Sequence, residues 1–248
     1  MTKPSSEQLI ESLNDCIHIW RCQPSLFPQE SVSGSYYPLM NENERARYHR
    51  FRFEKDRLNH LLTRALIRTT LSRYVPAVEP MDWRFSHNPY GKPLIANSLK
   101  WSPQFNISHS NDLIVVAISK NGTIGVDVEN IKERKNIDGL IDFCFNEEEI
   151  KYIKLDDDED AISSRFFELW TLKESYMKAD GKGLAIGLKE IFFTLDEGEI
   201  TFGTTKIYDE HQPNWNFFSS KFLNNYALGI TSSMPIKTIK HFTTSLDL

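Results

Sequence analysis

The chain has 248 residues, 40% hydrophobic and 12% aromatic, so it can bury a sizeable core as one large or two small domains rather than remain disordered. Its formal net charge of −5 argues against a nucleic-acid binder that works through overall positive charge. Three scattered cysteines form no CxxC pair, and there is neither an apolar signal segment nor an apolar run long enough for a membrane span. These features predict a cytoplasmic protein with free thiols, no membrane contact and no metal site built on cysteine.

The first half of the sequence alternates between strand and helix patterns. Residues 16–22 alternate apolar and polar side chains with the two-residue period of a strand, and leucines at helical spacing predict a helix from Glu54 to about Tyr74. The segment NPYGKP, residues 88–93, is a turn by its proline and glycine content. Three short strand-like runs follow, at residues 105–108, 113–119 and 124–129.

The second half begins with helices and ends with strands. Asn146, with Glu149 three residues later, is the pattern of a helix cap, and a longer helix is expected from about Ala161 to Asp180, ended by the glycines of DGKGL. Only strand candidates come after it, at residues 191–195, 199–202, 215–220, 226–231 and 236–242. The order suggests two α/β halves that meet near residue 120, with no internal repeat visible by residue identity.

Two clusters of charge lie within this pattern. Between Arg45 and Arg57 the chain carries seven basic side chains against two acidic ones, whereas residues 156–160 are all acidic. The acidic run is most simply a solvated loop that adds negative charge before the next helix. The basic stretch is more often a solvated helix face than a binding site, unless another feature of the chain requires phosphate.

The segment GVDVE places two carboxylates on one strand face. Alternate side chains of a strand share a face, so Asp127 and Glu129 point the same way while Val126 and Val128 point into the core. Oxygen ligands of this kind suit Mg²⁺, which proteins hold by few carboxylates together with substrate phosphates. For an isolated D-x-E pattern, a strand whose outer face meets water is the commoner interpretation.

The helix pattern RFFELWTLKESYMKADGKGL contains a lysine in an apolar stripe. The stripe consists of Phe166, Leu169, Trp170, Tyr176 and Met177, and Lys173 falls in its middle. Such a lysine must either extend its amine to water or meet an anion. Glu174 and Lys178 lie one turn apart beside the stripe, where an ordinary surface pair is the simplest interpretation.

The segment FNISHS ends a strand just before a polar turn. His109 has no metal-ligand spacing to another histidine, so a phosphate contact and a structural histidine remain the two alternatives.

Taken together, the four motifs resemble one enzyme family. NPYGKP, FNISHS, GVDVE and FELWTLKESYMKADGKGL occur in the order and at the spacing of the 4'-phosphopantetheinyl transferases of the surfactin-synthetase-activating (Sfp-like) type. The resemblance extends from about Arg45 to Leu184. Each motif alone is weak, but their joint match is highly specific.

The resemblance implies a fold and a domain division. The expected fold is α+β, a pseudo-dimer of two similar α/β halves in one chain with the active site in the cleft between them. Residues 1–120 would form the N-terminal half with the coenzyme A phosphate contacts, and residues 121–248 the C-terminal half with the magnesium and catalytic residues. The chain is expected to act as a monomer.

The resemblance also implies roles for individual residues. Asp127, Glu129 and Glu174 match the family's Mg²⁺ ligands, and Lys178 matches the lysine near the transferred phosphate and the leaving group. Glu174 is in addition the candidate base for the serine proton, directly or through a water. Contacts to coenzyme A are implied for Arg47, Arg50, Lys92, Ser108, His109 and Lys173, with Ser108 and His109 at the 3'-phosphate.

The implied reaction moves the 4'-phosphopantetheine group of coenzyme A onto a serine of an apo acyl, polyketide or peptidyl carrier protein. It releases 3',5'-ADP and leaves the holo carrier protein. Two alternatives belong to other classes: a catalytically inactive module that binds carrier proteins, and a different magnesium-dependent enzyme that binds nucleotides. Loss of one of the three carboxylates would have indicated the first, and failure to bind or turn over coenzyme A would favour the second.

Overall fold

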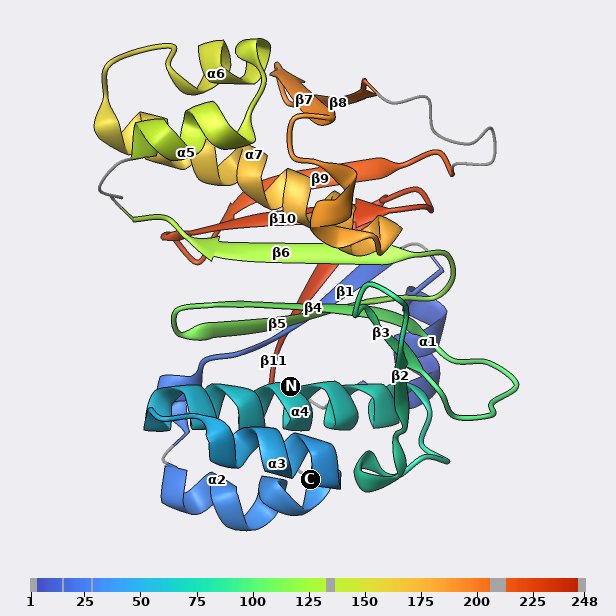
Figure 1. Cartoon of the computed structure of the whole chain (residues 1–248). Coiled ribbons are helices and arrows are strands. Elements are labelled where there is room, and N and C mark those ends of the chain that lie inside the picture. The colour runs from blue at the N-terminus through green and yellow to red at the C-terminus, as the bar shows by residue number, and fades with distance from the viewer. Residues whose placement is uncertain (1–3, 15, 28, 133–136, 206–212, 245–248) are drawn as a thin grey trace. The chain divides into compact units, whose positions relative to one another are not determined.

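We analysed a computed structural model of the chain, which describes residues 4–14, 16–27, 29–132, 137–205 and 213–244. The chain forms two compact units (Figure 1). The first comprises Met1–Asn88, Pro93–Asn121 and Lys237–Leu248, and the second comprises Pro89–Lys92 and Gly122–Ile236. A boundary was expected between residues 120 and 121. Two short segments, Pro89–Lys92 and Lys237–Leu248, belong to the opposite unit from the one that this boundary would give them. The mixed α and β content agrees with the expected fold class.

The first unit is built on a four-stranded sheet in the order β11-β1-β5-β4. These strands are β1 (Cys16–Cys22), β4 (Gln104–Ser110), β5 (Leu113–Ser119) and β11 (Thr238–Thr243). β11 pairs parallel with β1, and the other neighbours are antiparallel. The remaining elements are α1 (Ser6–Ser12), α2 (Gln29–Tyr36), α3 (Glu42–Arg50), α4 (Glu54–Tyr74) and the two-stranded sheet of β2 (Phe85–His87) with β3 (Pro93–Ile95).

The second unit is built on a three-stranded antiparallel sheet in the order β6-β10-β9. Its strands are β6 (Ile124–Asn130), β9 (Asn216–Phe222) and β10 (Tyr226–Ser232). The long helix α7 (Glu159–Asp180) packs along this sheet (Figure 1). The unit also contains α5 (Ile137–Cys144), α6 (Glu147–Ile153) and the two-stranded sheet of β7 (Ile191–Asp196) with β8 (Glu199–Thr204).

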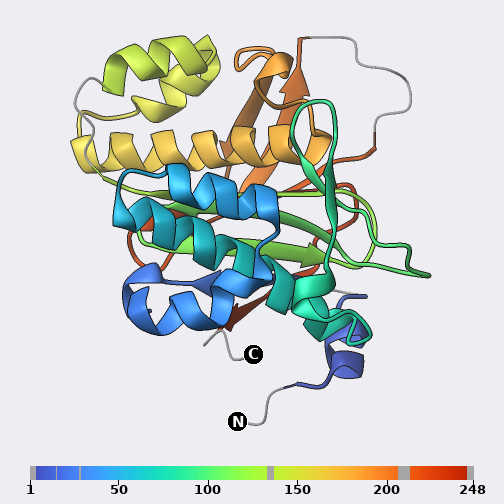
Figure 2. The ribbon, with the colours of Figure 1, turned by 60° about the horizontal axis from the view of Figure 1, so that its bottom comes forward.

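Each unit has its own hydrophobic core beneath a long helix. In the first unit the apolar face of α4 packs with aromatic and aliphatic residues of the sheet, and α3 lies beside α4 (Figure 2). In the second unit the core is rich in aromatic rings from α7 and from the strands β7, β8 and β9. The described residues contain no helix with the length and apolar character needed to cross a bilayer.

Most elements expected from the sequence are confirmed. β1 and α4 have the predicted bounds, Asn146 and Glu149 form the predicted capping box, and the five late strands are all present. Helix α7 begins at Glu159 rather than at Ala161, because the side chain of Asp158 accepts hydrogen bonds from two backbone amides of the first turn. The end of the acidic run is thus a helix start rather than a loop.

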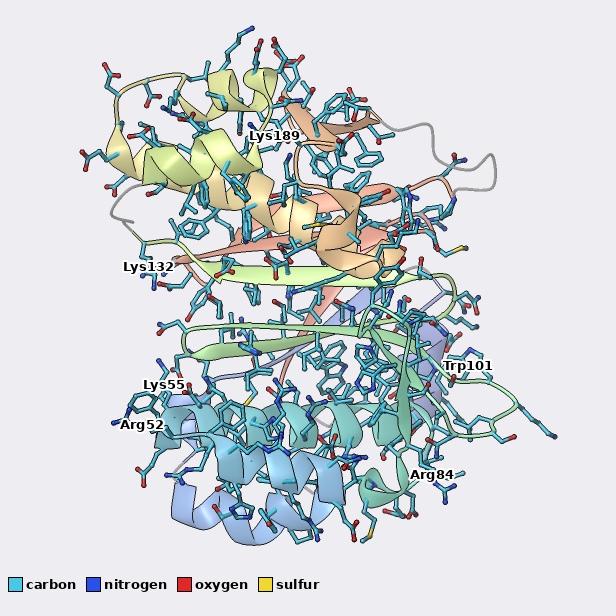
Figure 3. All side chains as sticks on the ribbon, in the orientation of Figure 1. Arg52, Lys55, Arg84, Trp101, Lys132 and Lys189 are labelled. Carbon is cyan, nitrogen blue, oxygen red and sulfur yellow. The ribbon has the colours of Figure 1, made fainter. Side chains whose placement is uncertain are left out.

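The basic stretch from Arg45 to Arg57 is divided between two helices. It covers the end of α3, a short break and the start of α4. The exposed Arg52 of the break and Lys55 of α4 are labelled in Figure 3. Helix α3 has an Asn41–Glu44 capping box, a pattern that the sequence also shows.

Candidate functional site

Two glycines allow α7 to approach the sheet of the second unit closely. A Cβ atom on Gly125 of β6 would lie 1.9 Å from the Ser175 carbonyl oxygen, and one on Gly229 of β10 would lie 2.4 Å from the Thr171 carbonyl oxygen. Any side chain at either position would collide with the helix backbone. Glycine at these positions therefore brings α7 directly onto this face of β6 and β10.

The same strand face carries the two carboxylates of GVDVE. Asp127 lies directly opposite Gly229 in the antiparallel register, and it follows Gly125 by two residues, so its side chain points toward α7. Glu129, two residues further on, shares that face and is half-buried, whereas Asp127 is only 4% exposed. The prediction of a shared face is confirmed, but the face meets a helix rather than water.

Glu174 and Lys178 of α7 meet these carboxylates. The Lys178 amine donates to Asp127 Oδ1 at 2.6 Å and to the Val126 carbonyl oxygen at 3.2 Å. The simplest interpretation of the sequence was a surface pair between Lys178 and Glu174 on the helix. In the structure Lys178 instead pairs with Asp127 of β6. Burial raises the pKa of Glu174, and the negative charges of Asp127 and Glu129 raise it further, against an opposing effect of Lys178.

The donor atoms of these side chains suit a divalent cation. Asp127 and Glu129 lie close enough to Glu174 to disfavour its charge, and with the Lys178 ammonium the three carboxylates make a hard-oxygen donor set of net negative charge. That chemistry fits Mg²⁺. Across the described residues, however, no three His, Cys, Asp or Glu side chains are already arranged as a metal site. The Lys178 ammonium pairs with Asp127 and offsets part of the charge of the three carboxylates.

Lys92 belongs to the second unit although it precedes β6 by many residues. Its amine donates to the Ala179 carbonyl oxygen at 2.8 Å and to the Ile124 carbonyl oxygen at 3.3 Å. It thereby satisfies an otherwise open carbonyl near the end of α7. Burial lowers the pKa of Lys92 to about 8, although the charge of Asp180 acts in the opposite direction. The acceptor Ala179 follows Lys178 by one residue and Glu174 by five, so the Lys92 amine lies at the same end of α7 as these two side chains.

In the first unit, Ser108 and His109 lie on β4, paired with Val115 and Ile114 of β5. Neighbouring residues of a strand point to opposite faces, and here Ser108 is buried while His109 is exposed. The imidazole of His109 is therefore accessible to a ligand. The hydroxyl of Ser108 is largely shielded from solvent.

Arg47 and Arg50 lie three residues apart in the last turn of α3, and both are exposed. Residues at this spacing are neighbours on a helix surface, so the two guanidinium groups can face the same anion. Tyr48 between them is buried against the core of the first unit.

Comparison with known proteins connects these residues to a family. Residues 123–231 match the 4'-phosphopantetheinyl transferase superfamily, and residues 28–121 match the family described as 4'-phosphopantetheinyl transferase, N-terminal. The chain is 31% identical over 208 residues to a phosphopantetheinyl transferase from Thraustochytrium sp., an alignment that covers 74% of this chain and 72% of that protein. The chain belongs to the 4'-phosphopantetheinyl transferase superfamily. It is an enzyme, as the sequence analysis predicted.

Further relatives place the chain among the Sfp-like phosphopantetheinyl transferases. It is 32% identical to the 4'-phosphopantetheinyl transferase HetI of Nostoc sp., with 75% of this chain and 77% of that protein aligned. It is 30% identical to the 4'-phosphopantetheinyl transferase Sfp of Bacillus subtilis, with 72% and 75% aligned. The resemblance drawn from the four motifs is confirmed.

One residue of this phosphopantetheinyl transferase lies elsewhere than expected. Lys173 was expected at a phosphate, but its side chain is fully buried and its amine lies 2.7 Å from Glu149 Oε2. The amine also donates to the carbonyl oxygens of Leu188 at 2.8 Å and Ile191 at 2.7 Å. An ammonium has three hydrogens, and these three short contacts account for all of them. The structure therefore corrects the expected role of Lys173, which is structural.

Sequence reasoning missed the partner of Lys173. Glu149 was interpreted only as a capping residue, yet it is buried and its Oε1 also accepts from the Phe193 amide at 3.1 Å. The place of Lys173 in an apolar stripe indicated either water or an anion, and the structure supplies the Glu149 carboxylate. Sequence reasoning also missed the close packing at Gly125 and Gly229. For Gly125 a signal was available, because it precedes Asp127 by two residues and so lies on the same strand face.

Proposed function

We propose that the enzyme transfers the 4'-phosphopantetheine group of coenzyme A to a serine of an apo carrier protein, with Mg²⁺ as cofactor. The reaction would release 3',5'-ADP and give the holo carrier protein. The observation that carries this proposal is the gathering of Asp127, Glu129, Glu174 and Lys178 on one helix–strand face, in a chain of the phosphopantetheinyl transferase family.

In this proposal Asp127, Glu129 and Glu174 hold Mg²⁺. When bound, the ion would neutralise charge on the pyrophosphate oxygens of coenzyme A. Lys178, whose side chain is 29% exposed, would contact the transferred phosphate and support the leaving oxygen. Binding of a cation by Asp127 would release the Lys178 ammonium for this contact, because the carboxylate would no longer need it as a counter-charge.

Glu174 would accept the proton of the attacking serine, directly or through one water. The serine oxygen forms a bond to the phosphorus that bears the pantetheine arm, and the bond from that phosphorus to the leaving 3',5'-ADP breaks. The position of Glu174 on α7, facing the Asp127–Glu129 strand and one turn before Lys178, supports this role. Positioning and charge compensation supply most of the catalysis in reactions of this kind.

Residues of the first unit would bind the coenzyme. We assign the 3'-phosphate to the β4 segment Ser108–His109, with the exposed His109 imidazole as its side-chain contact and Arg47 and Arg50 as further cationic contacts. The exposure of His109 and of both arginines supports this assignment. Lys92 would contact the coenzyme from the end of α7, where an anion would stabilise the ammonium form that burial disfavours.

A single chain supplies every proposed group, which supports a monomer as the active form. The three cysteines, all within the described residues, remain thiols, which fits a reducing compartment such as the cytoplasm. An inactive carrier-binding module is disfavoured because all three carboxylates are present and interact. A different magnesium-dependent nucleotide enzyme is disfavoured by the family membership.

The test is intact-mass analysis of apo acyl, polyketide and peptidyl carrier proteins incubated with the enzyme, coenzyme A and Mg²⁺. We expect a carrier protein to gain the mass of one phosphopantetheine group, and a metal chelator to stop the gain. Asp127→Asn should lower the rate by about a hundredfold or more, since it weakens a metal ligand. Asp196→Asn is the matched control, because Asp196 is an exposed carboxylate at the end of β7 in the same unit. Full activity of Asp127→Asn in the presence of chelator would exclude the magnesium assignment.

A further inference from the structure

Each unit buries one cation at the same place on its long helix. Arg68 is the fifteenth residue of α4 counted from Glu54, and Lys173 is the fifteenth residue of α7 counted from Glu159. Arg68 is 1% exposed and Lys173 is 0% exposed. Burial of a cation costs free energy unless a partner compensates it, so two such residues at matching positions call for a shared explanation.

Both cations meet a capping-box glutamate at the same distance along the chain. Arg68 Nη2 lies 2.7 Å from Oε2 of Glu44, which is 24 residues earlier. Lys173 Nζ lies 2.7 Å from Oε2 of Glu149, which is likewise 24 residues earlier. Each glutamate is the third helical residue of a short helix, and an asparagine caps each one in the same reciprocal way.

Both cations also bind a backbone carbonyl 15 residues later. Arg68 Nη1 donates to the Trp83 carbonyl oxygen at 2.6 Å, and Lys173 Nζ donates to the Leu188 carbonyl oxygen at 2.8 Å. In each unit a two-stranded antiparallel sheet begins within three residues of that carbonyl, with β2 in the first unit and β7 in the second. The buried cation thus joins a short helix, a long helix and the start of a hairpin.

The two sets of contacts share a pattern of burial rather than residue identity. Other residues of α4 and α7 at the same sequence separation as Arg68 and Lys173 are also buried in both units. They are the pairs Leu61/Phe166, Leu62/Phe167, Ile67/Leu172 and Leu71/Tyr176. The following position differs in chemistry, with Glu174 in the second unit and Thr69, bonded to the Ala65 carbonyl oxygen, in the first. The joint is therefore common to both units, whereas the carboxylate is not.

The short helices need this joint more than the long ones do. Helices α3 and α6 have nine and seven residues, too few to be stable by themselves in water. A buried ion pair contributes little net stability compared with apolar side chains, but it fixes which groups meet. Its effect should accordingly be on the place of each short helix relative to its long helix.

We propose that Glu44–Arg68 and Glu149–Lys173 are repeated positioning joints that hold the substrate-handling segments of the enzyme in place. The first joint sets α3, which carries Arg47 and Arg50, against α4. The second sets α6 and the β7 hairpin against the turn of α7 that carries Glu174. The assignment of substrates to these segments rests on the proposed function, but the existence of the joints does not.

The test combines hydrogen exchange with kinetics on the full-length enzyme. Lys173→Met should raise amide exchange in α6 and at residues 188–193 by about tenfold and leave α3 unchanged, and Arg68→Met should do the reverse. Lys173→Met should lower kcat, because Glu174 is the next residue. Arg68→Met should instead raise the Michaelis constant for coenzyme A. Arg68→Lys should restore most of the wild-type behaviour, since α7 uses lysine at this place.

Milder variants keep the test decisive if a methionine variant does not fold. Glu149→Gln and Glu44→Gln remove one charge and retain the shape of the capping box, and each should raise exchange in its own short helix alone. Exchange that rises in both short helices or in neither would overturn the joints. The positioning role would be overturned if exchange rises only in the expected short helix but Lys173→Met does not lower kcat and Arg68→Met does not raise the Michaelis constant for coenzyme A. If wild-type enzyme modifies no carrier protein, the proposed function fails, and the exchange pattern still decides whether the joints exist.

Discussion

Two lysines on α7, five residues apart, show how surroundings decide the role of a side chain. Lys173 is fully enclosed and its three hydrogens bind Glu149 and two carbonyl oxygens, whereas Lys178 is 29% exposed and pairs with Asp127. Only the second amine can meet a substrate phosphate without breaking the core. The same sequence motif therefore supplies one structural and one accessible cation.

The exposed imidazole of His109 gives a prediction for coenzyme binding. His109→Ala should weaken binding of coenzyme A by about tenfold and binding of 3'-dephospho-coenzyme A much less, because removing either partner makes the other irrelevant. Titration calorimetry with both ligands measures this. His87→Ala, which removes another exposed histidine of the first unit, is the control. Equal losses for the two ligands would assign His109 to a structural role.

His18 gives a prediction for stability at low pH. Burial, with a smaller effect of Lys240, lowers the pKa of His18 to about 4. Its Nδ1 lies 2.7 Å from the Tyr74 hydroxyl, which also accepts from Trp20, so the neutral ring completes a hydrogen-bond chain. The unfolded chain binds this proton near pH 6.5 and the folded chain does not. The free energy of unfolding should therefore fall by up to about 3 kcal/mol from pH 7 to pH 4.

Urea unfolding at a series of pH values tests this prediction. His18→Gln, which cannot gain a proton, should lose that part of the pH dependence, and His87→Gln at an exposed site should keep it. Identical pH slopes for wild type and His18→Gln would contradict the assignment.

At the scale of elements, the contact between α7 and the β6–β10 face sets the site. The helix brings Glu174 and Lys178, the strand brings Asp127 and Glu129, and Gly125 with Gly229 lets the two backbones meet. The proposed site therefore predicts that a glycine on β10, which carries no chemistry itself, affects activity.

Gly229→Ala should therefore lower both stability and transferase rate. The added Cβ would lie 2.4 Å from the Thr171 carbonyl oxygen, so α7 must shift, at a cost of about 1–3 kcal/mol in the free energy of unfolding. Chemical denaturation and the carrier-protein mass assay measure the two effects. Gly34→Ala is the matched control: nothing lies within 4 Å of its Cβ position in α2, and alanine should stabilise that helix by up to about 1 kcal/mol. An unchanged rate for Gly229→Ala would mean that the site tolerates a displaced helix.

At the scale of the whole molecule, the net charge of −5 bears on how a carrier protein docks. Carrier proteins are usually acidic, so overall attraction cannot guide the encounter. For the carrier protein we propose docking on the segment that joins β6 to α7, residues 131–155, with Phe143, Phe145 and Tyr152 as the apolar candidates; residues 133–136 lie outside the described part. Phe145 is instead core, and the Tyr152 hydroxyl donates to Glu168. Phe143 at 71% and Leu155 at 68% exposure remain as the apolar contacts.

Phe143→Ser and Leu155→Ser should raise the Michaelis constant for the carrier protein and leave that for coenzyme A unchanged. The basic residues of this segment add little, because Lys151 and Lys154 are already paired with Glu148 and Asp138. Leu26→Ser, at a leucine of equal exposure in the first unit, is the control. A carrier-protein Michaelis constant that stays constant in both variants would place docking on another surface.

The sequence by itself determined the local elements and the candidate chemistry. The two-residue period of β6 put Asp127 and Glu129 on one face, helical spacing gave α4 with its observed bounds, and the Asn146–Glu149 pattern gave the cap of α6. These features depend on backbone geometry over a few residues, which adjacent side chains control. The joint order of the four motifs also identified the family.

Only the tertiary structure decided what these elements meet. It turned the carboxylate face toward α7 rather than toward water, and it chose Glu149 rather than a phosphate as the anion for Lys173. It likewise placed Lys92 at the end of α7, where its partner Ala179 is 87 residues away in sequence. The stripe around Lys173 required an anion or water, but which one depended on the path of the 23 residues between Glu149 and Lys173. Contacts across such distances are set by packing, which no local pattern records.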